Sequence, residues 1–83
     1  MRKFDDNYTG IGYAVVYNYK SKLNGLNFDM TRLIDIELNL NDAVTLIGSR
    51  VSTYKEKLED YYISVYDYKT EIPEKIREIK MGR

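Results

Sequence analysis

The side chains with the clearest potential for chemistry are two carboxylates on one predicted strand, Asp35 and Glu37. Residues two apart on a β-strand point to the same face, and carboxylate oxygens are the ligands that Mg²⁺ prefers. Asp29, Lys20 and Lys22 are predicted to share that face, an arrangement that a metal-dependent nuclease could use. The pair has no third ligand nearby, and a polar strand face is usually solvated surface or the rim of a partner site. We therefore predict no metal and no cofactor.

Other residues offer little catalytic chemistry. The chain has no histidine and no cysteine, so the commonest general base, the thiol nucleophile and the soft metal ligands are missing. Gly10 and Gly12 are spaced as at the start of a phosphate loop, but such loops lie between a strand and a helix. Here the two glycines precede a predicted strand, and no Lys-Ser/Thr pair follows. We predict that the protein is not an enzyme.

A long β-hairpin, predicted over residues 11–40, would position the carboxylates. Its turn is Asn24-Gly25, a pair typical of type I′ turns, which need positive φ at both central residues. If the two strands pair regularly outward from this turn, without a bulge, the opposed residues are Leu23 and Leu26, Ser21 and Phe28, Tyr19 and Met30, Tyr17 and Arg32, Val15 and Ile34, Tyr13 and Ile36, and Ile11 and Leu38. Two shorter strands joined by a loop over residues 21–29 are the alternative.

This register sorts the hairpin into an apolar face and a mixed face, because side chains alternate along each strand. The apolar face would carry Ile11, Tyr13, Val15, Tyr17, Tyr19, Leu23, Leu26, Phe28, Met30, Ile34, Ile36 and Leu38. The mixed face would carry Ala14, Val16, Asn18, Lys20, Lys22, Asn27, Asp29, Thr31, Leu33, Asp35 and Glu37.

Downstream of residue 40 the hydrophobic period becomes helical. Asn41 or Asp42 can cap a helix whose buried stripe would be Val44, Ile47, Val51, Tyr54 and Leu58. Strand-like alternation returns over residues 61–69. A last helix is predicted from Thr70, with Pro73 tolerated in its first turn and a buried edge formed by Ile72, Ile76 and Ile79.

These elements predict a single α+β domain over residues 1–83, with a loose lead-in over residues 1–9 and a frayed end over residues 80–83. The order β-β-α-β-α gives a two-layer sandwich, in which two helices cover one face of a three-stranded, mostly antiparallel sheet. The strand order 2-1-3 is favoured because antiparallel neighbours are commoner. The parallel order 1-2-3 stays open.

Tyrosine is unusually abundant, with nine residues. Tyr62, Tyr66 and Tyr68 alternate on the face of the third strand that turns away from the predicted core. In the order 2-1-3 they would lie beside Val16 and Leu33 and form an apolar centre rimmed by Lys20, Lys22, Asp29, Asp35 and Glu37. An aromatic centre with a charged rim is typical of protein interfaces. The alternative explanation is the strand propensity of tyrosine.

Charge and composition limit the class of protein. Thirteen basic and thirteen acidic residues balance, which argues against a general polyanion binder and gives no reason to expect a membrane surface as partner. The sequence shows neither an apolar run of membrane-spanning length nor a signal peptide, so we expect a cytoplasmic protein. Enrichment in residues with AT-rich codons suggests a low-GC bacterium, or a phage or mobile element within one.

The function predicted from the sequence is protein binding through the exposed tyrosine-rich face. A phage or mobile-element protein that inhibits a host protein is one specific form. The first alternative is a nucleic-acid-binding domain that stacks bases on tyrosines, although Asp29, Asp35 and Glu37 would repel phosphates. The second is a homo-oligomeric structural protein, assembled through the same patch or through an exposed edge strand.

Overall fold

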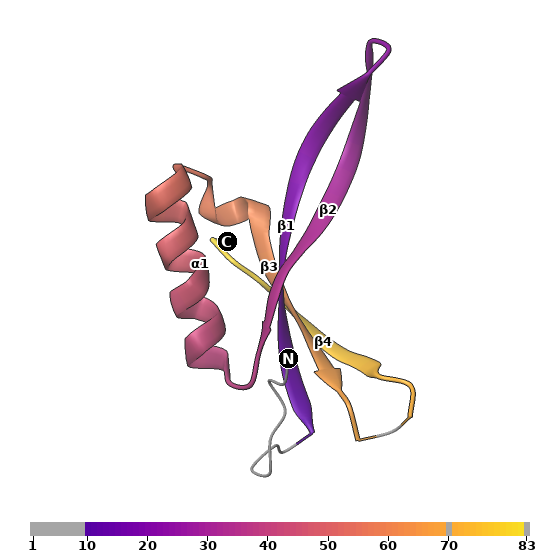
Figure 1. The fold of residues 1–83 in the computed structure, drawn as a ribbon, viewed down its shortest axis with the longest axis vertical. Coiled ribbons are helices and arrows are strands. Elements are labelled where there is room, and N and C mark those ends of the chain that lie inside the picture. The colour runs from indigo at the N-terminus through magenta and orange to yellow at the C-terminus, as the bar shows by residue number, and fades with distance from the viewer. Residues whose placement is uncertain (1–9, 70, 83) are drawn as a thin grey trace.

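The computed structural model describes residues 10–69 and 71–82, and Figure 1 shows its elements. A hairpin of two long strands comes first, followed by a helix, a short 3-10 helix and two further strands. Their bounds are β1 (Ile11–Leu23), β2 (Leu26–Glu37), α1 (Leu40–Tyr54), η1 (Leu58–Asp60), β3 (Tyr61–Asp67) and β4 (Glu74–Lys80). The predicted lead-in over residues 1–9 and the predicted helix start at Thr70 lie outside the described residues.

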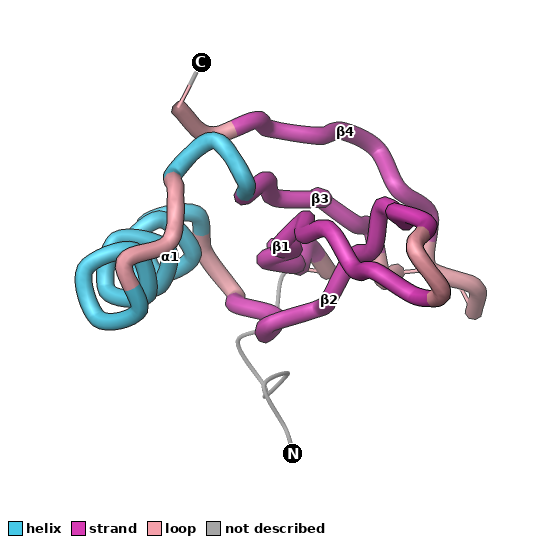
Figure 2. The backbone as a smooth tube through the Cα atoms, turned by 90° about the horizontal axis from the view of Figure 1, so that it is seen from above, coloured by secondary structure: helices cyan, strands magenta, loops and turns pink. Residues whose placement is uncertain are grey.

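The four strands form one antiparallel sheet in the order β2-β1-β3-β4. Helix α1 lies against one face of this sheet, as the view from above shows (Figure 2). The prediction of an α+β fold with an antiparallel sheet is confirmed, and β3 lies beside β1 as the order 2-1-3 requires.

The prediction of three strands and two helices is wrong, because the last segment is the strand β4. The spacing of Ile72, Ile76 and Ile79 fits a helix, but only Ile79 packs against the core, opposite Ile63 of β3. Ile72 is 80% exposed and Ile76 is 53% exposed. Pairing with the free edge of β3 provides hydrogen-bond partners for the backbone of this segment. The free energy gained in this way outweighs the weak local preference for a helix.

The hairpin turn is as predicted. Asn24 and Gly25 have φ values of 53° and 80°, both positive as a type I′ turn requires. The predicted register holds from Leu23–Leu26 as far as Val16–Leu33.

Beyond that point a β-bulge at Ile34 shifts the register by one residue. Val15 pairs with Asp35 and Tyr13 with Glu37, so the predicted pairs of Val15 with Ile34 and Tyr13 with Ile36 are wrong. A bulge places two residues of one strand opposite one residue of its neighbour, and every later side chain then changes face. Ile34 still packs against the core.

The core lies between α1 and the part of the sheet that is formed by β1 and β3. Its buried side chains are Val15, Ala43, Ile47, Tyr61, Ile63 and Val65. The helix begins one residue after its cap, Asn39, whose side-chain oxygen accepts the Asp42 N–H at 2.8 Å. The predicted caps, Asn41 and Asp42, are therefore too late in the chain.

The buried stripe of α1 differs from the predicted one in part. Ile47 and Val51 pack against the core as predicted, together with Leu40, Ala43 and Leu46. Val44, Tyr54 and Leu58 are exposed. The earlier helix start places Leu40, Ala43 and Ile47 on one face at i, i+3 and i+7.

The outer half of the β1–β2 hairpin projects well beyond the body of the molecule, whose principal extents are 47 × 28 × 26 Å (Figure 1). We call this part, residues 19–30, the hairpin arm. Four side chains predicted to lie on the core face are exposed there: Leu23 (61%), Leu26 (62%), Phe28 (41%) and Met30 (40%). The prediction had two helices cover this face, whereas the single helix α1 packs against the inner half of the hairpin (Figure 1).

Candidate protein-binding site

The face of the sheet that α1 leaves open carries the candidate site. On β3, Tyr62, Ser64 and Tyr66 alternate with the buried residues Tyr61, Ile63 and Val65 and so point to the open face. On β1, Val16 pairs with Tyr62 and Ala14 pairs with Ser64. Directly opposed residues share a face, so the alternation of side chains along these two neighbouring strands brings the site residues together.

These side chains surround an open cavity of about 470 Å³, which we call the tyrosine concavity. It is lined by Ala14, Val16, Thr31, Leu33, Ile36, Tyr62, Ser64, Tyr66, Tyr68, Pro73 and Lys75. All five apolar and aromatic residues of the predicted patch, namely Val16, Leu33, Tyr62, Tyr66 and Tyr68, belong to this lining. The small side chains of Ala14 and Ser64 are buried at its floor.

The ring of Tyr68 lies close to the backbone of β1 at Gly12. A Cβ atom at Gly12 would lie 2.5 Å from Cε2 of Tyr68, so only glycine leaves room for the ring. The Tyr68 N–H donates to the carbonyl oxygen of Gly10 at 2.6 Å, and the rings of Tyr66 and Tyr68 lie 5.9 Å apart. Burial raises the pKa of the Tyr68 phenol.

Charged residues of β4 form one rim of the concavity. Lys75 pairs with Tyr66, Glu78 with Ser64 and Lys80 with Tyr62, so all three share the open face. Glu78 lies 3.0 Å from the ammonium of Lys75 and 3.7 Å from that of Lys80, and the hydrogen bond from Lys75 lowers the pKa of the Glu78 carboxyl. The ammonium of Lys80 lies 5.7 Å from the centre of the Tyr62 ring. Sequence reasoning missed this rim because it predicted a helix there.

The predicted charged rim lies elsewhere. Lys20 is on the hairpin arm, where it forms an exposed ion pair with Asp29. The bulge at Ile34 places Asp35 opposite Val15 and Glu37 opposite Tyr13, on the helix side of the sheet. Ile36 takes their place on the open face and lines the concavity. Across residues 10–69 and 71–82, no group of three or more His, Cys, Asp or Glu could hold a metal ion.

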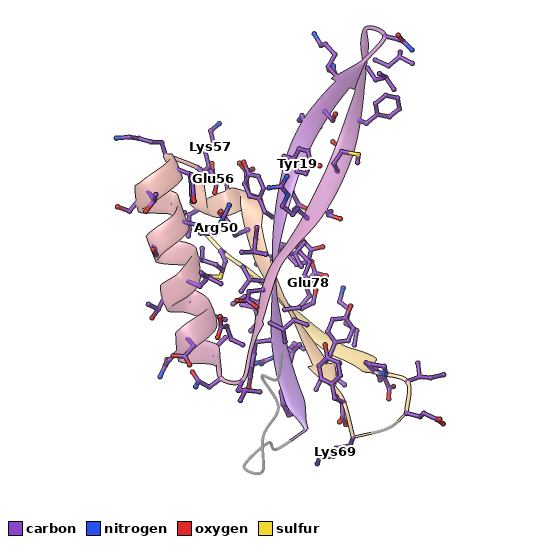
Figure 3. The ribbon with its side chains drawn as sticks, viewed as in Figure 1. Tyr19, Arg50, Glu56, Lys57, Lys69 and Glu78 are labelled. Carbon is purple, nitrogen blue, oxygen red and sulfur yellow. The ribbon has the colours of Figure 1, made fainter. Side chains whose placement is uncertain are left out.

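A second polar cluster surrounds the buried hydroxyl of Tyr61. Arg50 Nε donates to this oxygen at 3.0 Å, and the hydroxyl donates to the Glu56 carboxylate. Arg50 and Glu56 lie side by side near the end of α1 (Figure 3), 3.8 Å apart, and the Arg50 guanidinium lies 4.7 Å from the centre of the Tyr54 ring.

The Tyr61 hydroxyl at the centre of this cluster is closed to ligands, because Tyr61 is only 1% exposed. Burial raises the pKa of its phenol, and the hydrogen bond to Glu56 raises it further. The cluster fastens the end of α1 to the start of β3. No short motif indicates it, because Tyr61 is eleven residues from Arg50 and five from Glu56.

Comparison with family models, curated proteins and solved structures gives no match to this chain. Among the described residues, no helix is long and apolar enough to cross a membrane.

Proposed function

We propose that this chain is a small, non-enzymatic protein-binding module that takes its partner into the tyrosine concavity. The observation that carries the proposal is the gathering of Val16, Leu33, Tyr62, Tyr66 and Tyr68 around one cavity on the open face of the sheet. Tyrosine is enriched among the residues that dominate binding energy at interfaces, because it offers a large ring and a hydroxyl at low entropic cost.

The shape and charge of the concavity fit a protein partner. Its volume of about 470 Å³ is that of an open pocket, and it leaves room for one or a few side chains of a partner. The rim carries both signs of charge, since Glu78 is paired with Lys75 and Lys80. With two ammoniums and one carboxylate this rim has a net charge of only +1, which gives little of the electrostatic attraction on which binding of a phosphate backbone depends.

The narrower form of the proposal is a phage or mobile-element protein that inhibits a host protein in the cytoplasm. It is supported by composition and small size rather than by the site, so identification of the partner is its test.

The experiment is affinity capture of partners by the tagged full chain from a low-GC bacterial lysate, with the eluate analysed for protein and for nucleic acid. A stoichiometric protein partner supports the proposal if Tyr66→Asp weakens its binding by about thirtyfold or more, as for an interface hot spot. Val16→Asp should act in the same direction, because it places a charge within the same lining.

The matched control is Tyr54→Asp, the same chemical change at an exposed tyrosine on α1, away from the concavity. Circular dichroism should show that all three variants are folded. Capture that survives both Tyr66→Asp and Val16→Asp would contradict the proposal. Captured nucleic acid whose binding falls steeply with salt would favour the base-stacking alternative.

A further inference from the structure

The two edges of the sheet differ in how they are protected against pairing with another strand. The described part of β4 presents five charged side chains in seven residues, namely Glu74, Lys75, Arg77, Glu78 and Lys80. Charges on an edge strand oppose further pairing, since they would have to be desolvated beside a new neighbour. The β4 edge is therefore protected against pairing with another strand.

The β2 edge lacks this protection along the hairpin arm. From Leu26 to Thr31 its only charged residue is Asp29, and that carboxylate already pairs with Lys20 of β1. The bulge, which would discourage pairing, lies nearer the base at Ile34. The arm also projects away from the body, so a new strand can approach it without meeting α1 (Figure 1).

The register defines which backbone groups of β2 face outward. In a two-residue hairpin the residues next to the turn form a hydrogen-bonded pair, and such pairs then alternate along the ladder. Leu26, Phe28 and Met30 therefore bond to β1. The N–H and C=O groups of Asn27, Asp29 and Thr31 point to the free edge.

The same arm carries exposed apolar side chains on one face, namely Leu23, Leu26, Phe28 and Met30. An isolated two-stranded ribbon is only marginally stable in water, whereas additional strands with a shared apolar face stabilise it. The unprotected edge and the uncovered apolar face thus occupy one segment.

We propose that a second copy of this chain pairs with the outer edge of β2, antiparallel, about a two-fold axis at Phe28. This register opposes Phe28 to Phe28 of the second copy, and Leu26 to the second copy's Met30. The outward-facing Asn27 opposes the second copy's Asp29 and exchanges backbone hydrogen bonds with it. The dimer is isologous, as two-fold symmetry requires.

Neighbouring registers are less favourable. An axis at Asp29 opposes two like carboxylates, which destabilises a cross-strand pair. An axis at Met30 sets Phe28 against Arg32, and an axis nearer the turn leaves fewer residues to pair. The pattern of β2 is therefore self-complementary, and among the registers of a symmetric pair it selects the axis at Phe28.

The dimer does not depend on the proposed function. Strand β3 is separated from β2 by β1, so pairing at the outer edge of β2 leaves Tyr62 and Tyr66 accessible.

The first test measures the mass of the full chain by sedimentation equilibrium over a range of concentrations. The chain should dimerise, and Asn27→Pro should weaken dimerisation by roughly tenfold or more, because each copy loses one outward N–H donor. Proline is tolerated where a strand N–H faces solvent, so the monomer should remain folded. Asn27→Ala is the matched control, since it removes the same side chain and keeps the N–H.

The second test uses the absence of native cysteine to read the register. In the proposed dimer the two Phe28 residues form a non-hydrogen-bonded pair with Cα atoms about 4.5 Å apart, within reach of a disulfide. Phe28→Cys should therefore form a covalent dimer under mild oxidation much faster than Asn27→Cys, whose counterpart lies two residues out of register.

A monomeric mass at every concentration up to the solubility limit would overturn the inference, as would equal cross-linking of the two cysteine variants. A dimer that survives Asn27→Pro and dissociates with Tyr66→Asp would place the contact in the tyrosine concavity and would also overturn it.

Discussion

At the scale of single residues, the Tyr61 hydroxyl decides how firmly α1 is held to the sheet. It is buried and bonded to both Arg50 and Glu56, so Tyr61→Phe removes two charge-assisted hydrogen bonds. We expect the free energy of unfolding to fall by about 1–3 kcal/mol, measured by urea denaturation. Tyr54→Phe is the control, because Tyr54 is exposed and its substitution keeps the ring beneath Arg50. Equal losses in the two variants would mean that the hydroxyl network does not stabilise the fold.

At the scale of elements, one chemical change should have opposite effects in the helix and in the hairpin. Gly48 lies within α1, and a Cβ atom added there would meet nothing within 4 Å, so Gly48→Ala should stabilise the protein by about 0.5–1 kcal/mol. Gly25 has a φ of 80°, where alanine is strained by about 1 kcal/mol. Because the outer end of the hairpin arm projects beyond the body of the molecule (Figure 1), Gly25→Ala should increase hydrogen exchange about fivefold in the arm and leave exchange in α1 and β3 unchanged.

Thermal or urea denaturation of Gly48→Ala, and site-resolved hydrogen exchange of Gly25→Ala, check this pair. Loss of stability in Gly48→Ala would show that the helix glycine has a packing role that its open surroundings do not reveal. A uniform rise in exchange across Gly25→Ala would show that the hairpin arm unfolds together with the core rather than by itself.

At the scale of the whole molecule, buried and half-buried tyrosines should make the fold sensitive to alkali. Burial raises the pKa values of Tyr17, Tyr61 and Tyr68 above the ordinary value of about 10. The folded state therefore favours the protonated phenols. This stabilisation is complete below about pH 10 and is lost as the pH rises through the higher pKa values of the folded state. Urea midpoints should fall above about pH 10, and Tyr61→Phe should reduce the slope. A midpoint that rises or stays constant would contradict this assignment.

Predictions from the sequence succeeded where the signal was local. Asn24-Gly25 defined the turn because positive φ is a property of those two residues. The alternation of Tyr62, Ser64 and Tyr66 identified the open face of β3, because a period of two is built into any extended strand. The order of β2, β1 and β3 was also predicted correctly, although from the general preference for antiparallel neighbours and not from a local pattern.

Predictions failed where distant segments compete. The spacing of the isoleucines in the segment from Glu74 to Lys80 fits a helix, and pairing with the free edge of β3 makes this segment a strand. The bulge at Ile34 keeps that side chain in the core, while Asp35 and Glu37 exchange faces with Ile36. Regular pairing outward from the turn does not predict such a bulge.

The sequence by itself thus determined the turn, the alternation of side chains along β1 and β3 and the tyrosines of the open face, since these depend on backbone preferences of neighbouring residues. The tertiary structure alone decided the fourth strand, the Lys75-Glu78-Lys80 rim, the Tyr61 network and the bare hairpin arm. Each of these features depends on contacts between segments that are distant in the sequence. A local sequence pattern does not show which surfaces remain uncovered once the rest of the chain has packed.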